Sequence, residues 1–503
     1  MNILITAHEV APFYKWGGLG DFTGSLPKAL KKIGLDARVV IPFYQIIREE
    51  FNKNKFGVKE EKIGEFSIHF GQGREQISIY KSYFPNTHIP VYFLSNKPFL
   101  SYSGPRGRNK KVDQFAFFDL AVSHFIPWLA TNESWKPQVI HCNDWHTALV
   151  PLIVQKKVKI NIPTLLTIHN LNHQGRGSLK VLDLLDIKDE EVKTLRRGTP
   201  VTDINVLGEG IMHATRVSTV SPTYAKEIFE NYNSNPIRYF LDERKKALRQ
   251  DGYRTVTRQA QGSKQGKKDE VIGILNGIDY EVWNPKVDKF IFHQYDEGSF
   301  EDGKKNNKED LLKSLSLEDR PTFCFVGRMA RQKGIDLLIR AVKKIGNFDF
   351  NLIILGSGRP SIEKSVVGFA SHYPAKVSAQ IVYSEELAHR LYAGCDFIVI
   401  PSYYEPCGLI QMIAMKYATL PVASKTGGLK DSISNGKNGI LFEKNSVSSL
   451  AYAIKETLSI YKNKKRFKNM IMNAIKTDFS WDKSAILYKK LYQDIIVSNG
   501  VSA

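Results

Sequence analysis

A chain of 503 residues is long enough for more than one hydrophobic core, because single cores stop growing at about 250–300 residues. Its 42% hydrophobic content suits a globular protein, and with no run of about 18 apolar residues it predicts no transmembrane helix. The four cysteines are scattered without a C-x-x-C pair, which argues against a disulfide framework or a zinc site. The N-terminal residues lack the basic region of a signal peptide, so we expect a cytoplasmic protein.

The net charge of +20 is compatible with nucleic acid, a membrane surface or small anions as partners. Basic residues gather in two stretches, 238–268 and 462–468. Neither interleaves aromatic residues as a single-strand binder does, and no helix-turn-helix, RRM or zinc-finger pattern occurs. Solvated surface is the simpler interpretation, with residues 258–268 as a flexible loop and 462–468 in a surface helix. We expect neither a nucleic-acid nor a membrane partner.

The first elements form a strand, a glycine-rich loop, a helix and a second strand. The loop contains Lys15, Gly17 and Gly18, and Asp21 stands where an N-cap belongs. Backbone amides and a lysine can meet a phosphate in such a loop, although GGLG is not the spaced G-x-G-x-x-G fingerprint. The expected order is strand 3–6, loop 11–20, helix 22–33 and strand 37–42.

Polar residues follow several later strands of the N-terminal half. His169 comes directly after an apolar strand, and such positions often form sites in α/β folds. His141 and His146 lie near another strand end, where a structural role is the simpler interpretation. The expected strands are 91–94, 138–141, 164–168, 216–220 and 271–275.

The C-terminal half repeats the alternation of strands and helices, with expected strands at 322–326, 351–355, 380–383, 396–401 and 420–423. Two successive alternations predict an α/β protein with two doubly wound, Rossmann-like domains that face each other across a deep cleft. We place the domains at 1–272 and 273–480, followed by an amphipathic helix within 481–503.

The loops of the C-terminal half carry the strongest chemical signal. Arg328 and Lys333 follow a strand and suit a diphosphate, which arginine binds bidentately and lysine as a point charge. Glu405 follows another strand and could face positive charge that develops at an anomeric carbon. Cys407 lies in the same loop, where a small buried residue is the simpler interpretation. No D-x-D cluster stands beside these groups, and two cations would make a metal ion unnecessary.

A set of short motifs, in order along nearly the whole chain, resembles the bacterial glycogen synthase and plant starch synthase family of GT-B glycosyltransferases. Each motif is weak alone, but the ordered set is highly specific. The motifs are KWGGLGD at 15–21, DWH at 144–146, TIHNL at 167–171, TVSPTYA at 219–225, ILNGID at 274–279, EPCGL at 405–409 and TGGL at 426–429.

The resemblance implies transfer of glucose from ADP-glucose to the non-reducing end of an α-1,4-glucan such as glycogen, with retention of configuration and without a metal or other cofactor. It also implies that the final helix packs back on the N-terminal domain. The implied catalytic residues are Asp21, His169, Arg328, Lys333 and Glu405. The implied donor-binding residues are Lys15, Gly17, Gly18, Asn276, Cys407, Gly408, Leu409, Thr426, Gly427 and Gly428.

Some positions depart from the family pattern. Trp16 replaces a small or β-branched residue, Gly208 a lysine, and Tyr403 and Ser424 each an arginine. Ile413 stands where many other GT-B transferases carry a ribose-binding glutamate, which favours this family over them. Two alternatives stay open: a related transferase that uses UDP-glucose or another acceptor, and a catalytically weakened glucan-binding homologue.

Overall fold

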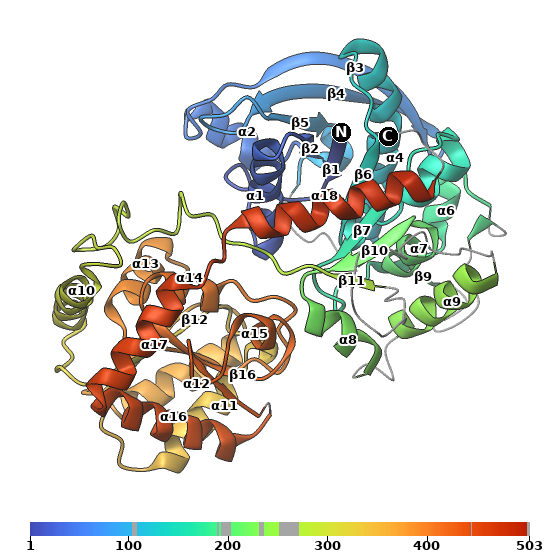
Figure 1. The fold of residues 1–503 in the computed structure, drawn as a ribbon. Helices are drawn as coiled ribbons and strands as arrows, with labels where there is room; N and C mark the ends of the chain where they lie inside the picture. The colour runs from blue at the N-terminus through green and yellow to red at the C-terminus, as the bar shows by residue number, and fades with distance from the viewer. Residues whose placement is uncertain are drawn as a thin grey trace. The chain divides into compact units, whose positions relative to one another are not determined.

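The computed structural model describes residues 1–102, 108–188, 191–192, 203–230, 236–250, 271–443 and 445–499. The loop predicted at 258–268 lies outside the described residues. The chain forms two compact units (Figure 1). The N-terminal unit comprises Met1–Val220, Ala225–Ile274 and Trp481–Ala503, and the C-terminal unit comprises Ser221–Tyr224 and Leu275–Ser480.

The N-terminal unit is built on one sheet of nine described strands in the order β11-β10-β7-β6-β1-β2-β5-β4-β3. All neighbours pair in parallel except β4, which is antiparallel to both β3 and β5. The central strands are apolar runs because both of their faces are buried. The strands are β1 (Asn2–Thr6), β2 (Asp36–Pro42), β3 (Glu61–Phe70), β4 (Gly73–Tyr83), β5 (Pro90–Ser95), β6 (Val139–Asn143), β7 (Thr164–Ile168), β10 (Arg216–Thr219) and β11 (Val271–Gly273), with a separate pair β8 (Arg176–Ser178) and β9 (Asp203–Asn205).

The last helix, α18, packs with α1 over this sheet and shares one hydrophobic core with it (Figure 1). A buried hydrogen bond of 2.8 Å between His141 Nδ1 and the Tyr492 hydroxyl also joins α18 to β6. The helices of this unit are α1 (Gly18–Lys32), α2 (Gln45–Asn52), α3 (Lys97–Leu100), α4 (Arg108–Asn132), α5 (Val150–Ile153), α6 (Lys180–Leu185), α7 (Val206–His213), most of α8 (Pro222–Glu230), α9 (Pro236–Gln250) and α18 (Trp481–Ser498).

The helix α1 begins four residues earlier than the sequence predicts. Gly17 is the N-cap in extended conformation, and Asp21 lies inside the first turn. The predicted N-cap role of Asp21 is therefore wrong. Its carboxylate pairs with Lys15 at 2.6 Å, which keeps an acidic group at the positive end of the helix dipole.

The C-terminal unit contains a six-stranded, fully parallel sheet in the order β14-β13-β12-β15-β16-β17. The strand predicted at 380–383 is wrong in position, because the pairing with β13 ends at Gln380 and residues 381–383 leave the sheet. The strands are β12 (Thr322–Val326), β13 (Asn351–Leu355), β14 (Val377–Gln380), β15 (Phe397–Ile400), β16 (Leu420–Ser424) and β17 (Ile440–Phe442).

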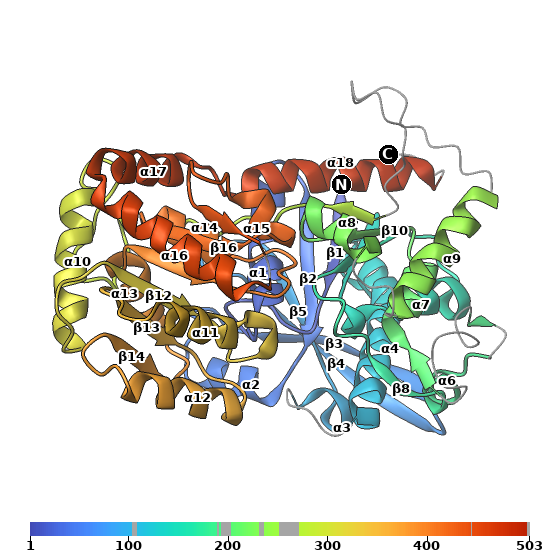
Figure 2. The ribbon, with the colours of Figure 1, turned by 90° about the horizontal axis from the view of Figure 1, so that it is seen from below.

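Helices cover both faces of the C-terminal sheet, with α11 and α12 on one side and α13 and α14 on the other (Figure 1 and Figure 2). This is the arrangement that right-handed crossovers produce on either side of the first strand. The helices are α10 (Phe300–Ser314), α11 (Ile335–Ile345), α12 (Pro360–Ser371), α13 (Glu385–Gly394), α14 (Ile410–Lys416), α15 (Gly427–Ser432), α16 (Val447–Lys462) and α17 (Lys464–Lys476).

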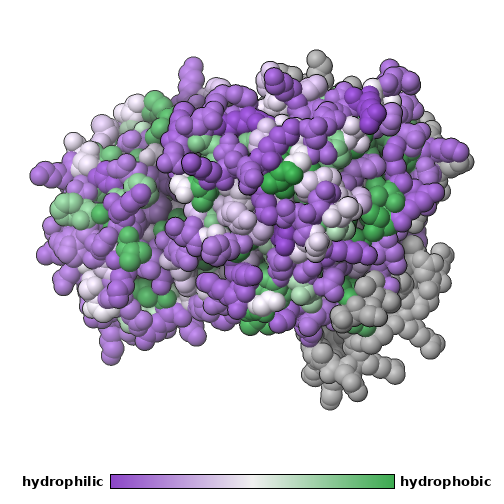
Figure 3. Space-filling view, turned by 90° about the horizontal axis from the view of Figure 1, so that it is seen from above, coloured by the Kyte–Doolittle hydropathy of each residue, from purple (hydrophilic) through white to green (hydrophobic). Residues whose placement is uncertain are grey.

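The surface is predominantly hydrophilic on the face shown in Figure 3, where hydrophobic residues are scattered among polar ones. Scattered apolar residues of this kind are normal for a globular protein. Among the helices described here, none is both long enough and apolar enough to cross a membrane.

Candidate active site

The glycine-rich loop between β1 and α1 is fixed by a buried carboxylate. Glu9 Oε2 accepts hydrogen bonds from the N–H groups of Trp16 and of Gly17, the latter at 3.2 Å. Glu9 is only 3% exposed, and burial raises the pKa of its carboxyl to about 7. Because Glu9 binds the N–H groups of the two peptides that flank Trp16, Lys15 is presented from a defined loop at the start of α1.

His169 is a neutral, oriented imidazole at the carboxyl end of β7. Burial lowers its pKa to about 3. Its Nε2 lies 3.0 Å from Asn143 Oδ1, and the Asn143 amide nitrogen donates to the carbonyls of Thr6 and His141. The amide orientation is thereby set, so His169 holds its proton on Nε2 and keeps a lone pair on Nδ1.

Asp144 supports this histidine through the backbone. Its Oδ1 accepts from the N–H groups of His169, at 2.7 Å, and Asn170, at 3.3 Å. Burial raises the pKa of Asp144 to about 7, and its φ of 58° places it in the left-handed region. The DWH motif therefore positions His169 through its aspartate.

The other two histidines considered from the sequence are buried. His141 is fully paired through Tyr492 and Thr167, which is a structural role. His146 stacks on His8 with ring centroids 3.6 Å apart, and burial lowers the pKa of both rings. Sequence reasoning missed His8, although it lies just after β1, as His169 lies just after β7.

In the C-terminal unit, Lys333 and Glu405 form a close ion pair. Lys333 Nζ donates to Glu405 Oε2 at 2.6 Å, and Ser402 Oγ donates to the same oxygen at 2.8 Å. Glu405 is 5% exposed, so its charge is held mainly by these two donors. Arg328 lies in the same β12–α11 connection as Lys333 and is exposed. The structure thus brings Lys333 and Glu405 together and leaves Arg328 accessible.

Glycines allow three loops to meet at Glu405. Gly334 has φ 67°, and a Cβ there would lie 1.9 Å from the Pro401 carbonyl oxygen. A Cβ at Gly427, φ 44°, would lie 1.9 Å from the Glu405 carbonyl oxygen. Gly428 N–H donates to that oxygen at 3.0 Å, so this predicted donor-binding amide is engaged within the protein. The loops after β12, β15 and β16 therefore fix one another.

The remaining predicted donor-binding residues of the C-terminal unit lie in the loops after β15 and β16, except Asn276, which follows β11. Cys407 is buried next to the backbone N–H of Asn276, and burial raises the pKa of its thiol to about 12, so it stays protonated. Asn276 Oδ1 has no hydrogen-bond partner among the described residues. The others lie at helix starts: Gly408 and Leu409 before α14, and Thr426 before α15.

Comparison with known proteins places this geometry in a family. The model of the starch synthase catalytic domain matches residues 2–243, and that of glycosyl transferases group 1 matches residues 306–477. Glycogen synthases of Caldicellulosiruptor bescii and Kosmotoga olearia are each 36% identical over 99% of this chain and 100% and 98% of their own. The chain belongs to the glycogen synthase and starch synthase family. It is therefore a glucosyltransferase.

Solved structures agree with this assignment. The catalytic domain of starch synthase IV from Arabidopsis thaliana, bound to ADP and acarbose, has a TM-score of 0.82 at 26% identity and covers 99% of both chains. Sucrose-phosphate synthase from Thermosynechococcus elongatus, with a TM-score of 0.58 at 18% identity, shares the fold over 99% of both chains. Both Rossmann-like units thus belong to the GT-B fold predicted from the sequence.

Two departures from the family pattern lie beside the Glu405 loop. The Tyr403 hydroxyl donates to Asp336 Oδ2 at 2.8 Å, and Arg340 pairs with the same carboxylate at 2.8 Å. Arg340 also lies 3.3 Å from the Tyr403 hydroxyl, so α11 supplies a cation next to the position where an arginine is expected. Ser424 is buried at the end of β16, and its hydroxyl has no partner in the described part of the chain.

The other two departures lie in the N-terminal unit. A Cβ at Gly208 would lie 2.4 Å from the Phe240 ring, so α9 packs on α7 where a longer side chain has no room. The side chain of Trp16, in the glycine-rich loop, is 70% exposed.

Tyr383 is a candidate that the sequence analysis missed. It is 77% exposed in the loop after β14, at the same sheet edge as Arg328 and Glu405. Sequence reasoning counted it as the last residue of a strand. An apolar run that ends in tyrosine beside a helix start was the available signal.

Substitution of Gly334 tests the fit of the loops. We expect the free energy of unfolding of Gly334→Ala to be at least about 2 kcal/mol lower than that of wild type, because the new methyl group clashes with the Pro401 carbonyl. The variant should also lose activity. Gly436→Ala is the matched control, because φ is 74° there and no atom lies within 4 Å of the new Cβ. Urea unfolding of both variants measures the difference, and equal losses would contradict the close approach.

Glu9 predicts a specific pH dependence of stability. Its folded-state pKa of about 7 exceeds the value of about 4.5 in the unfolded chain, so the folded protein binds more protons between these pH values. The contribution of Glu9 to stability is therefore lost as the pH rises from about 4.5 to 7 and is constant above that. The free energy of unfolding of Glu9→Gln, relative to that of wild type, should therefore rise by at most about 3 kcal/mol over this pH range.

Urea unfolding at pH 5, 6, 7 and 8 measures this difference. Glu49→Gln, on the exposed side of α2, is the control and should follow the wild type at every pH. A constant difference between Glu9→Gln and wild type across the series would show that Glu9 is already ionised at pH 5.

Proposed function

We propose that the protein transfers glucose from ADP-glucose to the non-reducing end of an α-1,4-glucan with retention of configuration. The observation that carries this proposal is the Lys333–Glu405 pair, which sets a cation and a nearly buried carboxylate at the carboxyl edge of the C-terminal sheet. In open α/β sheets this edge is where ligands bind. The ADP and acarbose bound to the similar Arabidopsis starch synthase IV support the same donor and acceptor class.

The cations act on the diphosphate. Negative charge develops on the leaving ADP as the glycosidic bond to glucose breaks, and fixed positive groups stabilise it without reorganisation. Arg328 is exposed and suits bidentate phosphate binding, whereas Lys333 is oriented by its ion pair. We therefore assign the stabilisation of the leaving ADP to these two side chains and propose no metal ion or further cofactor.

Glu405 is proposed to face the positive charge that develops on the glucose. Oε2 is occupied by Lys333 and Ser402, so Oε1 is the oxygen available to a sugar hydroxyl or to the positive charge on the anomeric carbon. Its burial strengthens this interaction because the local dielectric is low.

The N-terminal unit carries neutral and cationic candidate groups of its own. The lone pair on His169 Nδ1 can accept a hydrogen bond from a glucose hydroxyl, and Lys15 can meet phosphate from the start of α1. Asp21 orients Lys15 through their ion pair of 2.6 Å.

Tyr383 is the residue that we propose to contact the nucleobase of the donor. An exposed phenol ring at the strand edge offers a flat, apolar face on which adenine can stack. The second candidate donor, UDP-glucose, is favoured by the absence of arginine at Tyr403 and Ser424, although Arg340 restores a cation beside Tyr403.

A cytoplasmic location stays part of the proposal. All four cysteines, Cys142, Cys324, Cys395 and Cys407, are buried and free, as expected in a reducing compartment.

Release of nucleotide with glycogen as acceptor tests the function. We expect turnover with ADP-glucose that exceeds turnover with UDP-glucose. Glu405→Ala should lower the rate by at least about a hundredfold, because the carboxylate acts on charge that develops only in the transition state.

Glu443→Ala is the control, since Glu443 pairs with Lys425 on the exposed surface of the same unit and should keep the wild-type rate. Turnover with UDP-glucose alone would transfer the assignment to the second candidate. Glycogen binding without turnover of either donor would identify a glucan-binding homologue.

A further inference from the structure

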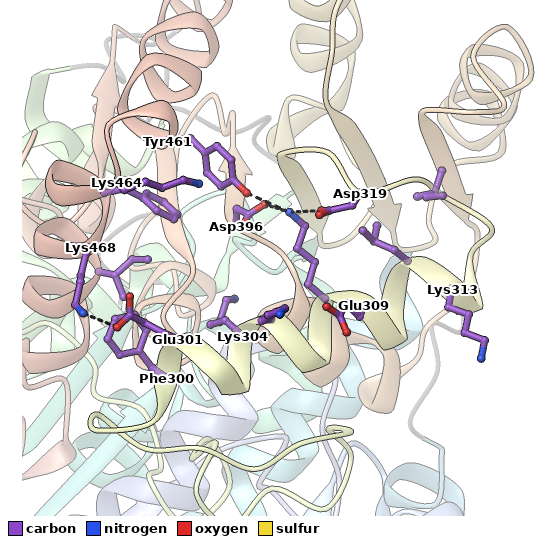
Figure 4. A pocket seen from close by; sticks show the side chains of 16 residues that line it. Phe300, Glu301, Lys304, Glu309, Lys313, Asp319, Asp396, Tyr461, Lys464 and Lys468 are labelled. Carbon is purple, nitrogen blue, oxygen red and sulfur yellow. Dashed lines mark hydrogen bonds and ion pairs between the residues drawn. The ribbon is translucent and has the colours of Figure 1, made fainter.

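The C-terminal unit contains a cavity of about 610 Å³ between α10 and the start of α17 (Figure 4). Asp319, just before β12, and Asp396, just before β15, form part of its wall. Arg328 and Glu405 follow the opposite ends of the same two strands. The cavity is therefore separated from the candidate active site by the length of a five-residue strand, about 15 Å.

One side of the cavity is apolar and aromatic. Tyr461 ends α16 nearby, and Phe300 and Phe467 come from α10 and α17. The volume suits one small ligand, and flat aromatic faces suit a ring-shaped group. The apolar lining residues are Phe300, Leu312, Leu317, Tyr461, Phe467 and Ile471.

The charged side of the cavity has an excess of lysine. Four carboxylates face the lysines, and three of these are already paired: Lys308 Nζ lies 2.9 Å from Asp396 and 3.1 Å from Asp319, and Lys468 pairs with Glu301 (Figure 4). The lining lysines are Lys304, Lys305, Lys308, Lys313, Lys464 and Lys468.

Lys464 is the cation best placed for a ligand. Its Nζ lies 4.2 Å from the centre of the Tyr461 ring, and no carboxylate of the described residues forms an ion pair with it. Its charge therefore lies over the Tyr461 ring at the aromatic wall of the cavity, and Lys308 Nζ lies 5.5 Å from the centre of the same ring. A ligand with a ring and an anionic group would contact both at once.

The surrounding helix end adds to this preference. Five of the seven residues 462–468 are basic and none is acidic, and α17 begins within this stretch. Cations in a first helical turn face the positive end of the helix dipole and are disfavoured by a few tenths of a kcal/mol each. A bound anion would offset this repulsion.

We propose that this cavity binds a small organic phosphate, with its ring against the aromatic side of the cavity and its phosphate on Lys464. A phosphorylated sugar and a nucleoside monophosphate both combine a ring with a phosphate, so both fit this chemistry. This site is separate from the proposed donor site and does not depend on the proposed function.

Calorimetry on the full chain tests the proposal with four probes: inorganic phosphate, glucose 6-phosphate, adenosine 5′-monophosphate and maltotetraose. We expect glucose 6-phosphate or adenosine 5′-monophosphate to bind more tightly than inorganic phosphate. Lys464→Glu should weaken that binding by at least about tenfold. Glutamate in the first turn of α17 is favourable to the helix, so the variant should fold.

Lys465→Glu is the matched control, because Lys465 is in the same helical turn, is exposed and does not line the cavity. It should change the affinity by less than about threefold. Equal weakening by both variants would mean that only the general positive charge attracts the probe, and binding that neither variant affects would lie elsewhere. Absence of binding by both ring-bearing phosphates, or binding of maltotetraose that Lys464→Glu abolishes, would also overturn the proposal.

Discussion

The ion pair between Lys333 and Glu405 is the interaction on which the C-terminal site depends. A carboxylate that is 5% exposed requires charged or polar partners, and Glu405 has two of them on a single oxygen. Lys333 reaches it only because Gly334 allows the following turn to approach Pro401 closely. The same constraint fixes the loop after β16, whose glycines contact the backbone of the Glu405 loop. Backbone fit and side-chain electrostatics thus support one arrangement.

In the N-terminal unit, burial rather than pairing determines which groups are charged. The pKa of His169 falls to about 3, and those of Glu9 and Asp144 rise to about 7. The two carboxyls accept backbone hydrogen bonds and hold the glycine-rich loop and the end of β7 in place. The unit therefore carries an imidazole of defined tautomer and a partly exposed ion pair between Lys15 and Asp21. Because burial raises the pKa of Glu9, the stability of the protein is expected to depend on pH.

Much of this fold could be predicted from the sequence because buried parallel strands are short apolar runs. The strands expected at 322–326 and 351–355 are confirmed as β12 and β13, and that expected at 3–6 lies within β1. Other segments were less visible: the half-exposed β3–β4 hairpin and the 25-residue helix α4, which is buried on most of its faces and shows little amphipathic periodicity, were not predicted. The predicted start of α1 was wrong, because Asp21 pairs with Lys15 instead of capping the helix.

The candidate site shows the same division. Motifs identify Lys333 and Glu405, but only the structure shows that they touch, since 72 residues separate them. The sequence already favours a structural role for His141, but only the structure shows its partners, Thr167 and Tyr492, the latter 351 residues further along the chain. Tyr383 was missed because the end of β14 is set by pairing with β13, and the local sequence does not reveal that limit.

A double-mutant cycle on Lys333 and Glu405 tests the central claim most directly. The rate of nucleotide release from ADP-glucose would be measured for Lys333→Gln, Glu405→Gln and the double variant. If the two groups act as one unit, each single variant loses about a hundredfold in rate and the double variant stays within about threefold of the slower single variant. If the two losses multiply in the double variant, the side chains act independently and the account of the site is wrong.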